Sequence, residues 1–205
     1  GTPQSQDVLI AENPAQPLMR YWPVVAPETN RLWVFTLQPD RTYGLAMQDL
    51  SVPASTLTEI APAVGIIDFV TDTPEGPILY TTYQAPQGRL VKVLLANPAP
   101  ANWQSIVPEG QAPIDNWAIA GNNIVVETLK DATSVVDVYD MDGSNKRSVT
   151  LPGLGSVSAM NNSSGNGPAY LTYSSFTSAP TVYALDGTAA SLTTWQAASA
   201  SAGSA

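Results

Sequence analysis

Eighteen prolines are scattered through this chain of 205 residues, and they leave few windows long enough for an α-helix. Proline lacks a backbone N–H and clashes with the preceding helical turn, so a helix rarely continues through it. Between the prolines lie short runs rich in Val, Ile, Thr and aromatic residues, bounded by turn residues. The apolar spacing typical of helices is nearly absent. The chain is therefore predicted to be all-β.

The β-rich runs recur in groups of four, with a period of roughly 40–50 residues that is typical of propeller blades. The three clear groups, in chain order, have runs at residues 66–70, 77–82, 89–94 and 103–107; at 117–120, 124–129, 134–139 and 147–151; and at 155–159, 169–173, 181–185 and 192–195. Asp142-Gly143 and Asp186-Gly187 each separate two alternating runs, which is a strong hairpin signal. Four hairpin-linked strands per group describe a propeller blade.

A poorer group precedes these three. Its runs lie at residues 7–11 and 31–37, and a weaker one lies near 21–25, where Pro23 and Pro27 disfavour a strand. We therefore predict a partial β-propeller of about four blades, each a four-stranded antiparallel sheet. The predicted blades are residues 7–60, 61–110, 111–153 and 154–196, and the Ala/Ser/Gly-rich residues 197–205 are predicted to be a flexible tail. A β-sandwich is the competing architecture.

The chain contains no histidine and no cysteine. Ser-His-Asp and Cys-His nucleophilic chemistry need an imidazole, and zinc, haem and iron–sulfur sites draw on His or Cys ligands. No disulfide can form. We expect no catalytic triad, no metal site and no cofactor in this chain.

Charged residues make up only 12% of the chain, and the net charge is −9. A phosphate backbone would be repelled, so nucleic acid is not an expected partner. No apolar run approaches the roughly 20 residues that span a bilayer, so no membrane partner is expected either. The expected compartment is the cytoplasm or the periplasm.

Many segments resemble the propeller domain of the prolyl oligopeptidase family, the serine peptidases that include prolyl endopeptidase. The resembling segments are residues 7–14, 30–33, 85–91, 97–103, 106–109, 129–132, 138–143, 151–158 and 173–183. Their order and spacing extend over nearly the whole chain, and the bacterial-type enzymes are the most similar. The resemblance implies the C-terminal half of the N-terminal propeller.

In that family a seven-bladed propeller covers an α/β-hydrolase domain that cleaves short peptides after proline. The resemblance implies that this chain restricts access to short peptides and that its partner is the hydrolase domain of the same enzyme. No stretch fits Gly-x-Ser-x-Gly on a strand–turn–helix, so we expect the hydrolase domain to be absent from these residues. The family's pocket Arg and Cys have no counterpart here, whereas Met19 corresponds to a methionine that lines the substrate pocket.

Acidic and aromatic residues offer further candidates. Asp137, Asp140 and Asp142 resemble part of a calcium loop but lack its closing Glu, so a hairpin turn is the simpler interpretation. Glu127 interrupts an apolar run, and we expect it to face outward or into a solvated pore. Blade packing accounts for the tryptophans and tyrosines, with a stacking platform for sugars or peptides as the alternative. A free-standing protein-interaction module and a carboxylate-based glycosidase remain alternative functions.

Overall fold

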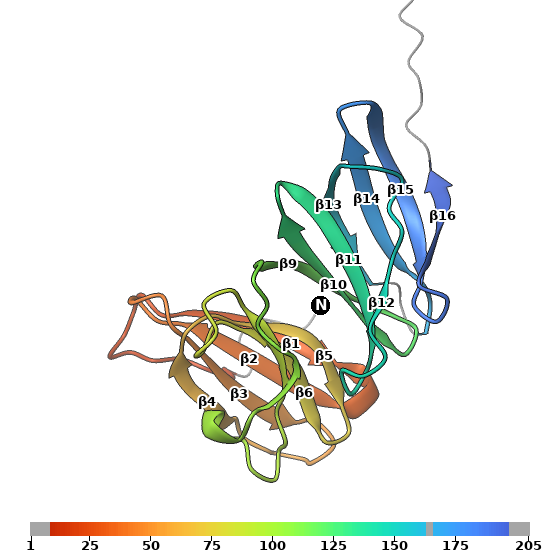
Figure 1. The fold of residues 1–205 in the computed structure, drawn as a ribbon. Helices are drawn as coiled ribbons and strands as arrows, with labels where there is room; N and C mark the ends of the chain where they lie inside the picture. The colour runs from red at the N-terminus through yellow and green to blue at the C-terminus, as the bar shows by residue number, and fades with distance from the viewer. Residues whose placement is uncertain (1–8, 163–165, 197–205) are drawn as a thin grey trace, which may run out of the picture. The chain divides into compact units, whose positions relative to one another are not determined.

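The computed structural model describes residues 9–162 and 166–196, and these residues form four four-stranded antiparallel sheets (Figure 1). Each sheet consists of four strands that are consecutive in the chain and adjacent in space, and no described strand is shared between two sheets. The prediction of an all-β, partial β-propeller is confirmed. The helical elements of the described part are two short 3-10 turns, Pro27–Thr29 and Pro100–Asn102, and neither has the length or apolar character of a bilayer-spanning helix.

The strand bounds follow the predicted runs closely from residue 67 onward. The first sheet contains β1 (Arg20–Ala26), β2 (Arg31–Leu37), β3 (Tyr43–Asp49) and β4 (Thr58–Val64). The second contains β5 (Ile67–Thr73), β6 (Gly76–Thr81), β7 (Arg89–Lys92) and β8 (Gln104–Val107). The third contains β9 (Ile114–Ala120), β10 (Asn123–Lys130), β11 (Thr133–Asp140) and β12 (Arg147–Ser148). The fourth contains β13 (Ser156–Asn161), β14 (Ala169–Ser175), β15 (Ser178–Asp186) and β16 (Ser191–Gln196).

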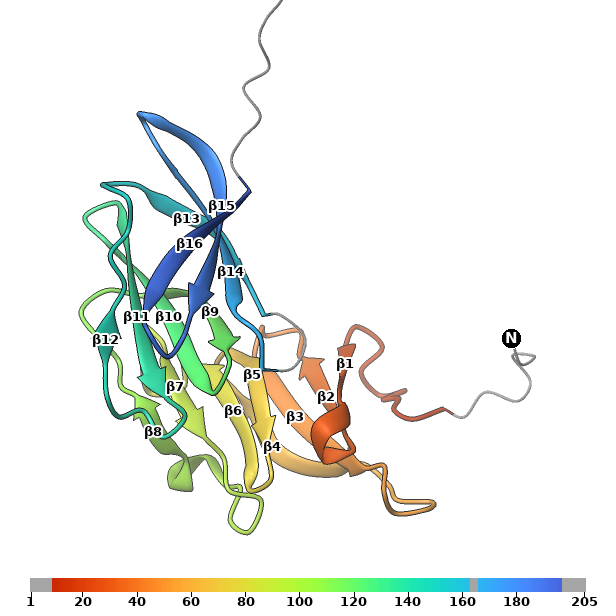
Figure 2. The same ribbon diagram turned by 90° about the vertical axis from the view of Figure 1, so that its right-hand side faces the viewer.

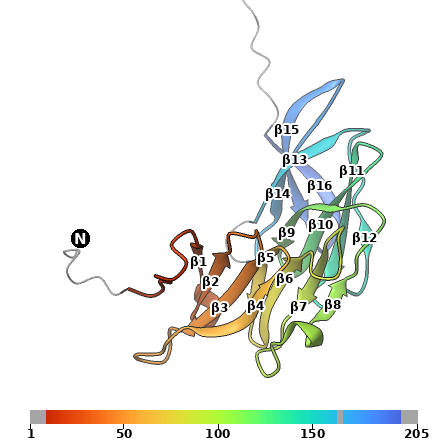
Figure 3. The same cartoon turned by 90° about the vertical axis from the view of Figure 1, so that its left-hand side faces the viewer.

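The first sheet differs most from the sequence prediction (Figure 3). Residues 9–11 of the predicted first run are not in a strand, and residues 7 and 8 lie outside the described part. The weak run near Pro23 instead forms β1, which is an edge strand of its sheet and pairs with β2. An edge strand tolerates proline because the missing N–H need not serve a second neighbour. β4 ends at Val64, so the predicted blade boundary at residue 60 lies inside a strand; the predicted tail, 197–205, lies outside the described residues.

The chain divides into two compact units. Within the described part, one unit comprises the residues up to 85 together with 90–105, and the other comprises 86–89 and 106–196. The core of the first unit is a buried cluster in which Trp33, Phe35 and Leu45 from the first sheet pack with Leu79 and Val91 from the second. The alternation of side chains along each strand places these residues on one face.

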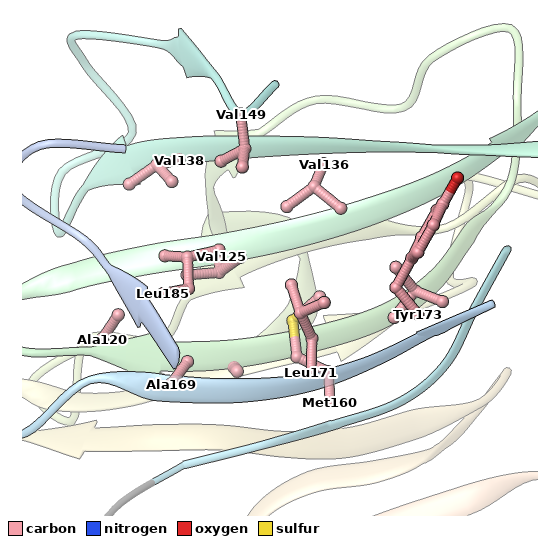
Figure 4. Close-up of a cluster of buried hydrophobic side chains, with 12 residues drawn as sticks. Ala120, Val125, Val136, Val138, Val149, Met160, Ala169, Leu171, Tyr173 and Leu185 are labelled. Carbon is pink, nitrogen blue, oxygen red and sulfur yellow. The ribbon is translucent and has the colours of Figure 1, made fainter. Parts of the chain in front are cut away.

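The second unit has its own core, formed by the facing surfaces of the third and fourth sheets. Figure 4 shows Val125, Val136 and Val138 directed toward Leu171 and Leu185. All five side chains are almost completely inaccessible to solvent. Burial of a branched aliphatic side chain contributes about 1.5–3 kcal/mol, so this sheet-to-sheet contact stabilises the unit strongly.

The β14–β15 hairpin extends beyond its neighbouring strands (Figure 2).

Candidate functional site

Met19, the predicted pocket residue, lies directly before β1 in the first unit. It is half-buried, and its backbone N–H donates to the carbonyl of Gln16 at 3.0 Å. This turn brings the chain into the edge strand of the first sheet. The assignment of Met19 to a substrate pocket stays a prediction.

The three aspartates of the calcium-loop candidate face different partners. Asp137 accepts a hydrogen bond from the Ser148 hydroxyl and pairs with Lys146. Asp140 accepts from side chains that lower its pKa, first Asn145 and then Arg147. Asp142 accepts from Ser144, whose side chain and N–H lower the pKa of that carboxyl. Within the described ranges, no three His, Cys, Asp or Glu residues are placed to share a metal ion.

Glu127 is fully buried, contrary to the expectation that it faces solvent. It lies on β10 on the same face as Val125 and directly opposite Val136, so it points into the apolar core of the second unit. The β9–β10 register shifts between Glu127 and Thr128. A bulge of this kind redirects side chains. The Asn116 amide donates to Glu127 Oε2 at 2.9 Å, whereas Oε1 has no hydrogen-bond partner within the described part of the chain.

We expect Glu127→Gln to be at least as stable as the unmodified chain and to gain about 1 kcal/mol, because the amide oxygen can still accept from Asn116 and a neutral amide is easier to bury than a carboxylate. Glu127→Ala should instead lose about 2 kcal/mol, since it leaves a cavity and an unpaired Asn116 amide. Urea unfolding at neutral pH measures both changes. A Glu127→Gln variant that is less stable than Glu127→Ala would contradict this assignment.

A cleft of about 660 Å³ lies entirely within the second unit, and we call it the β10–β11 cleft. Its floor is the face of β10 and β11 opposite the apolar core, including Val126, Val135 and Tyr139. One wall runs from the end of β8 to the start of β9, residues 107–114, and the other is Lys146. The cleft is thus built on paired strands, which position side chains more rigidly than loops do.

Backbone and side-chain hydrogen bonds hold the 107–114 wall in place. The carboxylate of Glu109 accepts from the N–H of Gln87 at 2.6 Å, and Ile114 donates to the Gln87 carbonyl at 3.0 Å. The N–H of Leu129 reaches the carbonyl of Pro113 at 3.4 Å, which joins the wall to β10. The wall is therefore fastened at both of its ends.

The charged part of the cleft is a short network around Asp137. This carboxylate is buried, and its Oδ2 lies 2.9 Å from Lys146 Nζ, which also lies 5.8 Å from the centre of the Tyr139 ring. The hydrogen bond from Lys146 to Asp137 raises the pKa of the lysine, so the ammonium stays charged throughout the neutral range. Burial raises the pKa of Tyr139, which keeps its hydroxyl protonated.

Sequence reasoning did not identify this cleft. The signal was present in part: Asp137 is a charge within the otherwise apolar run 135–139 of β11, and it alternates with Val135 and Tyr139 toward one face. Lys146 reaches Asp137 from the turn that follows β11. Their pairing depends on how that turn folds back, which local sequence patterns do not specify.

Four four-stranded antiparallel sheets, each built from strands that are consecutive in the chain, define the class as a β-propeller domain. A family model described as the N-terminal β-propeller domain of prolyl oligopeptidase matches residues 1–198. The chain belongs to this family.

Curated relatives and solved structures agree with this membership. The chain is 27% identical over 186 residues to the prolyl endopeptidase of Elizabethkingia miricola and 28% identical over 188 residues to that of Elizabethkingia meningoseptica. Each match covers 89% of this chain and 26% of the relative, so the chain spans about a quarter of these proteins.

Among solved structures, one from a study of two prolyl endopeptidases and their inter-domain dynamics superimposes with a TM-score of 0.84. It is 29% identical, and the match covers 96% of this chain and 29% of that one. Prolyl oligopeptidase B from Galerina marginata, as the apo protein, gives a TM-score of 0.83 at 16% identity, with 96% of this chain and 29% of that chain covered, and shows the same fold.

Proposed function

We propose that this chain works as part of the propeller of a prolyl oligopeptidase-type serine peptidase and restricts entry to short proline-containing peptides. The observation that carries the proposal is the set of four antiparallel sheets, which matches the propeller of a prolyl endopeptidase along almost the entire chain. The partner in this proposal is an α/β-hydrolase domain of the same enzyme. The peptides would reach that domain only after passing the propeller.

The chemistry of the chain supports a non-catalytic role. General-base activation of a serine requires a group such as the imidazole of the Ser-His-Asp triad, and these 205 residues contain no histidine. Bond cleavage in this proposal therefore belongs to the hydrolase domain. The contribution of the propeller is steric.

We expect the purified 205-residue chain to show no hydrolysis of a chromogenic Gly-Pro substrate. Turnover by the chain alone that a serine-directed reagent abolishes would contradict the proposal. The filtering role is tested by replacing the matching 186 residues of the Elizabethkingia miricola prolyl endopeptidase with this chain. The chimera should cleave short proline-containing peptides and spare long unfolded ones; equal cleavage of both would refute filtering.

A second candidate is a free-standing interaction module, and exposed aromatic residues of the fourth sheet favour it. Trp195 is 65% exposed and packs edge-on against Tyr170, with 5.2 Å between ring centres, and Phe176 is fully exposed at the β14–β15 turn. Exposed aromatic side chains are enriched at protein interfaces. Analytical ultracentrifugation separates the two candidates, because a closed stand-alone propeller should be monomeric, whereas part of a propeller with unpaired sheet edges should pair or aggregate.

A further inference from the structure

Asn166 and Gly167 form the only asparagine–glycine pair in the sequence, and they lie shortly before β14 in the second unit. The side chain of Asn166 is exposed, and it makes no hydrogen bond to another residue of the described ranges. Both residues line a cleft of about 460 Å³ together with Gly121 and Asp186. Solvent water therefore reaches the side-chain amide of Asn166.

The backbone N–H of Gly167 is the group that can react with this amide. It donates no backbone hydrogen bond within the described part of the chain. Glycine has no Cβ to hinder the approach of its nitrogen to the preceding side chain. The carbonyl of Gly167 accepts from the N–H of Gly121 at 2.8 Å, so the restraint on this residue lies on its other side. The pair thus combines an accessible amide carbon with an unhindered nitrogen.

Two aspartate–glycine pairs of the same unit are restrained where Asn166 is not. The N–H of Gly143 already donates to the carbonyl of Asp140 at 2.9 Å, and the carboxylate of Asp142 accepts a backbone N–H of its own turn at 2.9 Å. The carboxylate of Asp186 accepts two backbone N–H groups of the turn that follows it, at 2.8 and 3.0 Å. Turns of this kind hold the carboxylate against the backbone. Its carbon is therefore kept from the nitrogen of the next residue.

We propose that Asn166 is a site of spontaneous deamidation. The nitrogen of Gly167 attacks Cγ of Asn166, and the new C–N bond closes a succinimide ring. The side-chain NH2 leaves as ammonia, taking the proton of the Gly167 N–H. Solvent water then opens the ring at either carbonyl and leaves aspartate or isoaspartate at position 166. The reaction needs only this pair and water, so it is independent of the filtering role.

The modification has a structural consequence within the second unit. Isoaspartate routes the main chain through the side-chain carbon, so it adds a methylene group to the backbone beside Gly167. The bond from Gly121 to the Gly167 carbonyl joins this segment to the turn between β9 and β10. We expect isoaspartate to break that bond. Either product also adds a negative charge to the cleft that Asp186 already lines.

The test compares folded and urea-unfolded samples of the 205-residue chain after incubation in mildly alkaline buffer. Digestion with trypsin and chymotrypsin separates the three pairs, because Arg147 and Tyr170 lie between them. Mass spectrometry follows the replacement of NH2 by OH at residue 166, and chromatography resolves the isoaspartyl forms. We expect folding to slow the reaction at Asp142 and Asp186 at least roughly tenfold, because their hydrogen bonds must break first, and to slow it less than that at Asn166.

Two outcomes of this comparison would overturn the proposal. One is the absence of deamidation at residue 166 in the folded chain. The other is protection of residue 166 by folding of roughly tenfold or more, as at the two aspartates.

Variants identify the source of the released ammonia. Asn166→Gln keeps an exposed amide but disfavours ring closure, because the ring would be larger, and it should lower ammonia release by the folded chain. Gly167→Ala should slow deamidation at residue 166 at least roughly tenfold, because a Cβ then hinders the attacking nitrogen. Asn102→Gln is the matched control, because Asn102 is also exposed but precedes the bulky Trp103. Equal ammonia release by Asn166→Gln and Asn102→Gln would overturn the assignment.

Hydrogen exchange at the N–H of Gly121 tests the structural consequence. After equal incubation, this N–H should exchange at least roughly fivefold faster in the isoaspartate-containing chain than in Asn166→Gln, because a hydrogen bond that protects it is lost. Unchanged exchange at Gly121 would contradict the predicted loss of its bond to the Gly167 carbonyl.

Discussion

Asp72→Ala is expected to lower the free energy of unfolding by about 3–5 kcal/mol, the range for removing one partner of a buried ion pair. The side chain of Asp72 on β5 is only 3% exposed, and its carboxylate accepts hydrogen bonds from the hydroxyl of Thr29, the guanidinium of Arg31 and the indole N–H of Trp33. The substitution leaves these three donors without their shared acceptor. Arg31 retains its bonds to the carbonyls of Thr73 and Pro74.

Glu75→Ala is the matched control for this prediction. Glu75 also pairs with a cation, Lys92 at 3.0 Å, but its side chain is 60% exposed. Exposed ion pairs contribute little to stability because water screens them, so this variant should remain close to the unmodified chain. Urea unfolding followed by tryptophan emission and by circular dichroism measures both variants. A similar small loss in each would show that the Asp72 cluster contributes no more than a surface pair.

Gly143→Ala is the second substitution with a large expected effect, a loss of about 3 kcal/mol from backbone strain together with overpacking. Gly143 has a φ of +85°, which disfavours any residue with a Cβ. A Cβ at this position would lie 1.9 Å from the carbonyl oxygen of Ile106, so the backbone must shift to admit it. The turn after β11 therefore packs closely against the backbone near the end of β8.

Gly110→Ala provides the comparison within the same unit. Its nearest neighbour would lie 3.7 Å from the new Cβ, which is ordinary van der Waals contact. Its stability should change by no more than about 0.5 kcal/mol. The difference between the thermal unfolding midpoints of Gly143→Ala and Gly110→Ala measures how much stability is lost when a Cβ is forced into the close contact at Gly143. Equal midpoints would mean that the turn relaxes without strain.

Most strands were predictable because their signals are local. The runs at residues 77–82 and 124–129 correspond closely to β6 and β10, since apolar alternation and flanking turns lie in the same short segment. The Asp142-Gly143 turn was equally recognisable, and the positive φ of Gly143 is the reason that glycine is needed there. The first sheet was less predictable because Pro23 lies in a strand that only an edge position permits.

The candidate sites were much less predictable. Glu127 was expected to face water, yet the register shift beside it and the packing of two sheets enclose it. The partners of Asp72 lie 39 to 43 residues earlier in the chain, and no local pattern connects them. The Lys146–Asp137 pair depends on the return of a turn toward the strand that precedes it.

The all-β class, the grouping of strands in fours and the lack of a histidine-based catalytic triad can all be read from the chain alone, because alternation, turn chemistry and residue type are properties of short segments. Which charges are buried, which donors share a carboxylate and where a cleft opens depend instead on the folded arrangement. These features arise when sheets pack face to face, because packing removes some polar groups from water and leaves others at the rim. Residues that are distant in the chain then become each other's partners.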